Sequence, residues 1–173
     1  MGEYEMTTAE ETATTSMPLT ITRIFDAPRE LVFKAFTEPE HFTQWWGPNN
    51  FTTPHCTIDL RVGGKMHYCM RSPDGNEFWG IGVFQEIVEP ERLVYNDSFS
   101  DAEGNVVPAS DYGMGDWPLE TQVVMTFEEE GEKTRFTMQS FGMPEGKGRD
   151  GAEIGWGQSF DRLAAYVSSL SKA

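Results

Sequence analysis

Cysteine is scarce in this chain: only Cys56 and Cys69 occur among its 173 residues. A small domain held together by disulfide bonds has a denser set of cysteines, so the sequence excludes a disulfide framework. The apolar alternation around the two residues predicts a hairpin of two strands that places Cys56 opposite Tyr68 and turns Cys69 toward the other face. The two thiols then cannot bridge, and we expect both to be reduced.

Long apolar runs are also absent. No stretch approaches the roughly 20 residues that cross a bilayer, and the N-terminus is acidic and threonine-rich instead of basic and then apolar. We therefore expect a cytoplasmic protein that does not enter a membrane. Residues 1–17 show no buried face and are predicted to form a disordered leader ahead of a single domain at residues 18–173.

Positive charge is missing from the middle of the chain. Residues 72–132 contain fifteen acidic residues and one basic residue, Arg92, and the whole chain has a net charge of −15. This excess of negative charge repels phosphate backbones and anionic lipid, so neither nucleic acid nor a membrane surface is an expected partner. Two interpretations of the acidic segment stay open: a solvated surface, and a docking surface for a basic protein partner.

Catalytic and metal-binding motifs are missing as well. The sequence has no GxSxG or HExxH motif and no GxxxxGK[ST] phosphate loop. The predicted hairpin brings His55, His67 and Cys69 to one face, but no fourth zinc ligand is apparent. We therefore predict no metal, no cofactor and no catalytic constellation. If the protein is an enzyme, Asp97 or Tyr68 could supply the acid or base.

The chain does contain a clear pattern for two short helices. Residues 27–46 have apolar positions at helical spacing, interrupted at Pro39 and ending on Trp45 and Trp46. Asp26 stands where it could cap the first helix. Helices this short are not stable alone, so they must lie on another element.

The rest of the chain alternates in the manner of strands until a final helix. The predicted strands are residues 19–25, two within 54–72, 78–88, 92–99, 119–128 and 134–141. Gly80 and Gly82 suggest a bend or bulge. The final helix, from about residue 152 to 171, carries an apolar stripe of Trp156, Phe160, Leu163, Val167 and Leu170. This order predicts an α+β fold in which a curved antiparallel sheet wraps around a long C-terminal helix.

Four segments carry a family resemblance: ITRIFDAPRELVFKAFTEPEHFTQWWGP at 21–48, DLRVGGKMHYCMRSPDG at 59–75, GIGVFQEIVEPERLVY at 80–95 and GWGQSFDRLAAYV at 155–167. In this order they resemble the helix-grip fold of the START-like (SRPBCC) superfamily, and more narrowly the bacterial proteins related to the C-terminal domain of the heat-shock protein 90 ATPase activator. The resemblance implies an apolar cavity between the long helix and the concave sheet. It implies no co-chaperone role, because the eukaryotic activator binds its chaperone using a further N-terminal domain, for which residues 1–17 are too short.

Apolar side chains on the predicted inward faces are the candidate lining of such a cavity. They are Trp46, Met66, Tyr68, Met70, Trp79, Met125, Phe136, Met138, Trp156 and Phe160. Two directions stay open for Trp79, because Phe78, Gly80 and Phe84 form a competing alternation. Two interpretations remain for the whole set: a ligand cavity with an adaptable methionine lining, and a solid core.

The connection at residues 100–118 is long for a hairpin. It could be a mobile lid over the cavity or an ordered surface loop. The apolar anchors of a lid would be Tyr112, Met114 and Trp117.

These patterns favour a protein that holds a small apolar or amphipathic ligand in the helix–sheet cavity. One alternative is a cyclase, hydrolase or lyase acting on such a ligand in the same cavity, which requires a carboxylate or histidine facing the cavity with a perturbed pKa. The other is a protein-interaction (chaperone-associated) module that uses the acidic surface.

Overall fold

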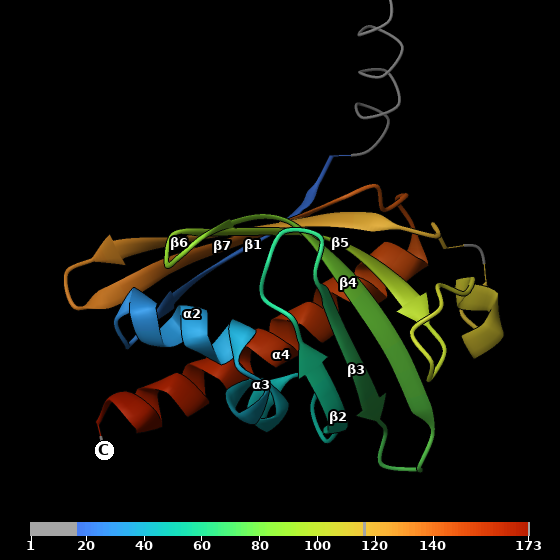
Figure 1. The fold of residues 1–173 in the computed structure, drawn as a ribbon, viewed down its shortest axis with the longest axis horizontal. Coiled ribbons are helices and arrows are strands. Elements are labelled where there is room, and N and C mark those ends of the chain that lie inside the picture. Colours follow the sequence, from blue (N-terminus) through green and yellow to red (C-terminus); the bar gives the residue numbers. More distant parts are fainter. Residues whose placement is uncertain (1–16, 116, 173) are drawn as a thin grey trace, which may run out of the picture.

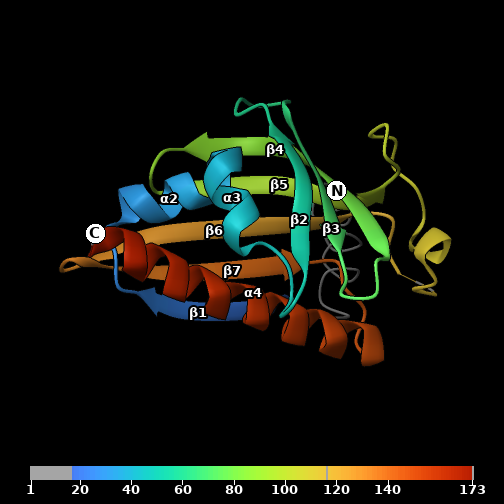
Figure 2. The ribbon, with the colours of Figure 1, turned by 90° about the horizontal axis from the view of Figure 1, so that it is seen from below.

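A computed structural model describes residues 17–115 and 117–172, which form one seven-stranded antiparallel sheet with its helices on one side (Figures 1 and 2). The strand order across the sheet is β1-β7-β6-β5-β4-β3-β2. The elements are β1 (Leu19–Phe25), α2 (Arg29–Thr37), α3 (Pro39–Trp45), β2 (Thr52–Ile58), β3 (Lys65–Arg71), β4 (Glu77–Val88), β5 (Arg92–Ser100), the 3-10 helix η1 (Ala109–Tyr112), β6 (Thr121–Glu130), β7 (Lys133–Phe141) and α4 (Lys147–Ser171). The predicted helix-grip order is thereby confirmed.

The predicted leader at residues 1–17 lies outside the described residues, except for the exposed Met17. Among the helices that the structure describes, none combines the length and the hydropathy of a segment that crosses a membrane.

Prolines set the boundaries of the two short helices. Pro28 is the N-cap of α2 and Pro39 opens α3, where a missing N–H costs no hydrogen bond. The prediction that Asp26 caps α2 is wrong, because the chain enters the helix only at Pro28. The Asp26 carboxylate lies 3.5 Å from the Lys172 Nζ atom instead.

The β2–β3 hairpin has the predicted register. Cys56 pairs with Tyr68 and His55 pairs with Cys69, so the two cysteines are free and lie on opposite faces. Alternation determined this register because a slip of one residue would have exposed every buried side chain of the hairpin.

Gly80 and Gly82 have a different role from the predicted bulge. The register shift in β4 falls between Phe84 and Glu86. A Cβ atom on Gly80 would lie 2.5 Å from the Tyr68 ring, and one on Gly82 would lie 2.9 Å from the Tyr95 ring. The two glycines therefore make room for two buried tyrosines.

Two boundaries differ from the prediction. The last helix begins at Lys147 instead of near residue 152, although Gly148 and Gly151 have low intrinsic helix propensity. Strand β6 begins at Thr121 instead of residue 119, and Leu119 is exposed.

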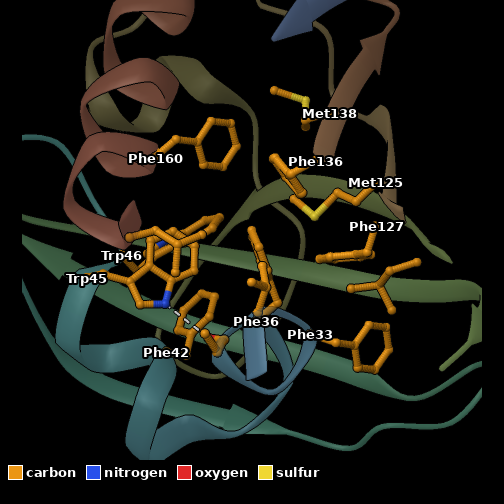
Figure 3. Close-up of a cluster of buried hydrophobic side chains, with 14 of the residues drawn as sticks. Phe33, Phe36, Phe42, Trp45, Trp46, Met125, Phe127, Phe136, Met138 and Phe160 are labelled. Carbon is orange, nitrogen blue, oxygen red and sulfur yellow. Dashed lines mark hydrogen bonds between the residues drawn. The ribbon is translucent and has the colours of Figure 1, made fainter. Parts of the chain in front are cut away.

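The core is built around Phe36 of α2 (Figure 3). Its ring stacks on Phe136 at 5.3 Å between centroids and meets Trp45 edge-on at 4.8 Å. Phe127 and Phe160 complete the surrounding shell at 5.6 and 6.3 Å. The two short helices thus lie on the concave face of the sheet and bury their aromatic side against it.

Candidate ligand cavity

A cavity of about 530 Å³ lies at the other end of the concave face, between the first turns of α4 and strands β3, β4 and β5. Figure 1 shows η1 and its loop at this same end of the molecule. Most of the lining is apolar, and the residues that border it are Trp46, Gly47, Pro48, Tyr68, Met70, Trp79, Gly80, Asp97, Ser98, Phe99, Met114, Trp117, Pro118, Thr121, Met143, Lys147, Gly148, Gly151, Ala152, Gly155, Trp156 and Ser159.

Small residues on α4 form one wall of the cavity. Gly148, Gly151, Ala152, Gly155 and Ser159 recur at helical spacing and all border it. Further along the helix the buried positions are the large Phe160, Leu163 and Val167, which fill the space against the sheet. The change in side-chain volume along α4 therefore coincides with the change from cavity to packed core.

The structure divides the ten predicted lining residues into two sets. Five border the cavity: Trp46, Tyr68, Met70, Trp79 and Trp156. The other five are buried in the packed core: Met66, Met125, Phe136, Met138 and Phe160. Alternation identifies the face of a strand, but it does not tell which part of that face another element covers.

Trp79 borders the cavity, yet its indole ring does not face it. The ring stacks on His67 at 4.9 Å between centroids and lies 5.2 Å from His55, on the face of the sheet opposite Gly80. The competing alternation through Gly80 and Phe84 is the one that faces the helices.

Two of the three predicted lid residues border the cavity, and the third does not. Met114 and Trp117 border the cavity, and Trp117 packs so closely on Gly148 that a Cβ atom there would lie 2.7 Å from the indole. The Tyr112 hydroxyl instead donates to the Ser100 carbonyl, and its ring lies between Phe78 and Phe99. Tyr112 thus anchors the loop to the sheet, while Trp117 contacts α4.

Asp97 of β5 is the acidic group that faces the cavity from the sheet. Burial raises the pKa of its carboxyl from 3.8 to about 7, although hydrogen bonding from the Ser98 backbone and from the Tyr68 hydroxyl lowers it in part. The Oδ1 atom is buried and has no hydrogen-bond partner. The neighbouring Tyr68 and Tyr95 have a raised pKa, first because they are buried and then because of the negative charge of Asp97.

Trp46 forms the aromatic wall beside this carboxyl. Its ring lies 5.2 Å from Tyr68 and 5.3 Å from Trp156, edge-on to both, and its Nε1 donor is buried without a partner. Arg162 of α4 holds the following turn, because its Nη1 atom donates to the carbonyls of Gly47 at 2.8 Å and Pro48 at 2.9 Å. The tryptophan is therefore fixed between α3 and α4.

The histidines of the β2–β3 hairpin form an aromatic cluster. His67 Nε2 lies 3.0 Å from the Asp101 carbonyl, and the rings of His55 and His67 are 5.9 Å apart. Within residues 17–115 and 117–172, no three His, Cys, Asp or Glu side chains gather closely enough to hold a metal ion.

A long helix held in a curved antiparallel sheet, with a cavity between them, defines a helix-grip protein. Residues 26–168 match the family model described as "Activator of Hsp90 ATPase homolog 1-like protein", so the chain belongs to this family. A search of curated proteins finds no match to the chain.

Solved structures from bacteria have the same fold. A protein from Arthrobacter aurescens is 28% identical with a TM-score of 0.73, over 88% of this chain and 86% of that one. A protein from Chromobacterium violaceum is 26% identical with a TM-score of 0.73, over 87% and 96%. The AHSA1 protein from Silicibacter pomeroyi, at 20% identity and a TM-score of 0.71 over 88% and 98%, is similar in fold alone.

Proposed function

We propose that the protein binds a small apolar or amphipathic molecule in the cavity between α4 and the sheet. The observation that carries this proposal is a largely apolar cavity of about 530 Å³ with a few polar groups in its lining. Its volume falls within the roughly 300–1,000 Å³ of small-molecule sites, which share this composition. Membership of a family with the helix-grip fold supports the same conclusion.

The contacts that would hold such a ligand are mainly apolar. Trp46, Met70 and Trp156 offer polarizable surface, and burial of apolar area contributes about 25 cal/mol per Å². Asp97 and Tyr68 would orient a polar end of the ligand. No covalent step is needed for this function.

Thermal-shift and NMR screening with lipid-like and aromatic compounds tests the proposal. Binders should raise the melting temperature and shift the backbone amides of Gly80, Ser98 and Gly155, which border the cavity. The absence of any binder would overturn it.

A cavity-filling substitution and a matched control at the surface test the location of the binding site. Ala152→Leu places a larger side chain at a cavity-lining helical position, while Ala165→Leu makes the same change on the exposed side of α4. Leucine is a good helix former, so both variants should fold. Binding should weaken at least tenfold in the first variant and stay within twofold in the second.

A second candidate is a proton-transfer reaction on such a ligand, by an enzyme of the cyclase, hydrolase or lyase type. The specific observation is the Asp97 carboxyl, whose pKa of about 7 suits general acid–base catalysis near neutral pH. Turnover of a bound carbonyl compound that disappears in Asp97→Asn, with binding retained, would support it. Turnover unchanged in that variant would exclude this role.

The protein-interaction hypothesis remains a prediction. Charge reversal across residues 86–132 in a pull-down experiment should release a basic partner if the acidic surface is used, and retention of the partner would contradict that use.

A further inference from the structure

The wall of the cavity contains a buried carboxyl group, that of Asp97. No ion pair among the described residues involves Asp97, and its buried Oδ1 atom accepts no hydrogen bond. A buried carboxylate is costly unless it is paired and hydrogen-bonded. The Asp97 Oδ1 atom is therefore an acceptor whose partner must be water, a proton or a ligand.

The surroundings of Asp97 are aromatic. Trp46 lies edge-on to Tyr68 and to Trp156 at centroid distances of 5.2 and 5.3 Å, and all three rings border the same cavity. Aromatic faces attract organic cations, tryptophan most strongly. An acidic group among several aromatic rings is a suitable receptor for an ammonium ion.

Other head groups match this wall less well. A carboxylate or phosphate would face the Asp97 charge, and the cationic residue at the cavity, Lys147, is exposed at the start of α4. A neutral alcohol could donate a hydrogen bond but would leave the charge unbalanced. The net charge of −15 also attracts cations to the protein and repels anions at long range.

We propose that the cavity selects amphipathic amines, with the ammonium group of the ligand on the Asp97 carboxylate and its apolar body against Trp46 and Trp156. This inference rests on the proposed binding function and names its ligand class. Asp97 fixes the orientation, and the aromatic and small-residue walls hold the chain or ring of the ligand.

Three ligands that share one apolar chain test the head-group preference: decylamine, 1-decanol and decanoate. Their affinities are measured by isothermal titration calorimetry at pH 7.5 and below the aggregation concentration of each compound. Decylamine should bind at least tenfold more tightly than decanol, and decanoate most weakly. Equal affinities, or tightest binding of decanol or decanoate, would overturn the amine preference but leave the binding function. If none of the three binds, both proposals fail for this class of ligand.

Two variants test whether Asp97 causes the preference for the amine. Asp97→Asn should reduce the affinity for decylamine at least tenfold and change that for decanol less than twofold. Glu128→Gln removes one negative charge from an exposed position of β6 and should leave both affinities unchanged. An amine preference that survives in Asp97→Asn would refute the assigned contact.

A third variant tests the aromatic wall without altering any charge. Trp156→Leu keeps an apolar side chain on α4 but removes one ring. The substitution should reduce the affinity for decylamine at least threefold more than the affinity for decanol, because only the cation interacts with the ring quadrupole. An equal loss for the two ligands would show that Trp156 contributes apolar area alone, contrary to the proposal.

Discussion

The two halves of the concave face differ although the same sheet and the same helix build both. In the packed half, Phe36 and its aromatic neighbours fill the space between α2, α4 and strands β6 and β7. In the open half, glycines at 148, 151 and 155 leave about 530 Å³ between α4 and strands β3 to β5.

The difference teaches that a cavity in this fold depends on side-chain volume along one helix and on where the short helices end. Helices α2 and α3 cover one half of the sheet and stop at Trp45, and Trp46 stands at the border. Close packing is the ordinary state of protein interiors, so the open half is the part that calls for a function.

Truncation in the packed half should have the largest effect. Phe36→Ala removes a ring that contacts four other aromatic rings and leaves a void, so we expect a loss of about 4 kcal/mol in the free energy of unfolding. Met114→Ala, at the exposed rim of the open half, should cost less than about 1 kcal/mol. Urea denaturation of both variants measures the contrast, and similar losses would contradict it.

The next effect concerns charge in the open half. The folded-state pKa of Asp97, about 7, is above its ordinary value of 3.8, so the folded state binds a proton more tightly than the unfolded state. The ionisation of this group therefore lowers the free energy of unfolding as the pH rises from about 4 to about 7, and the loss levels off above pH 7. The full pKa shift corresponds to about 4 kcal/mol at pH 8. Because the carboxyl borders a cavity that water can enter, we expect Asp97→Asn to raise the free energy of unfolding by a smaller amount, about 3 kcal/mol.

The pH dependence distinguishes this effect from a general change of net charge. The gain in Asp97→Asn should shrink as the pH falls from 8 to 4. Glu128→Gln, at an exposed position, should show a change within about 0.5 kcal/mol at every pH. Denaturation curves at several pH values measure both, and a gain in Asp97→Asn that does not vary with pH would be evidence against a buried ionised carboxyl.

The smallest effect comes from two glycines of α4. Nothing lies within 4 Å of a Cβ atom at Gly151, so Gly151→Ala should add about 0.7 kcal/mol through helix propensity. At Gly148 the same atom would meet Trp117, so Gly148→Ala should give no gain and should displace the loop from the cavity. Equal gains in thermal unfolding, with unchanged tryptophan fluorescence, would show that Trp117 does not rest on the helix.

Much of the fold could be predicted because its signals are local. The hairpin that pairs Cys56 with Tyr68 follows from alternation, and the helix boundary at Pro39 follows from proline chemistry. The face of α4 that carries Phe160 and Leu163 follows from helical spacing. Each of these needs only neighbours along the chain.

The candidate site could be predicted only in part. Tyr68 and Met138 both face the helices, but the first borders the cavity and the second is fully buried in the core. The spacing of Gly148, Gly151 and Gly155 places them on one face of a helix, and this pattern could have indicated the cavity wall of α4. The low helix propensity of Gly148 and Gly151 instead favours a loop before residue 152, and this is why the true start of α4 at Lys147 was missed.

The sequence by itself therefore determined the order of the elements, the register of the hairpin and the family, because periodicity and turn chemistry act over a few residues. The tertiary structure alone decided which half of the concave face is filled, that Asp97 borders the open half and forms no ion pair with another described residue, and that Gly80 and Gly82 accommodate tyrosine rings. These features depend on side chains far apart in the chain, whose volumes and charges meet only when the sheet closes around α4.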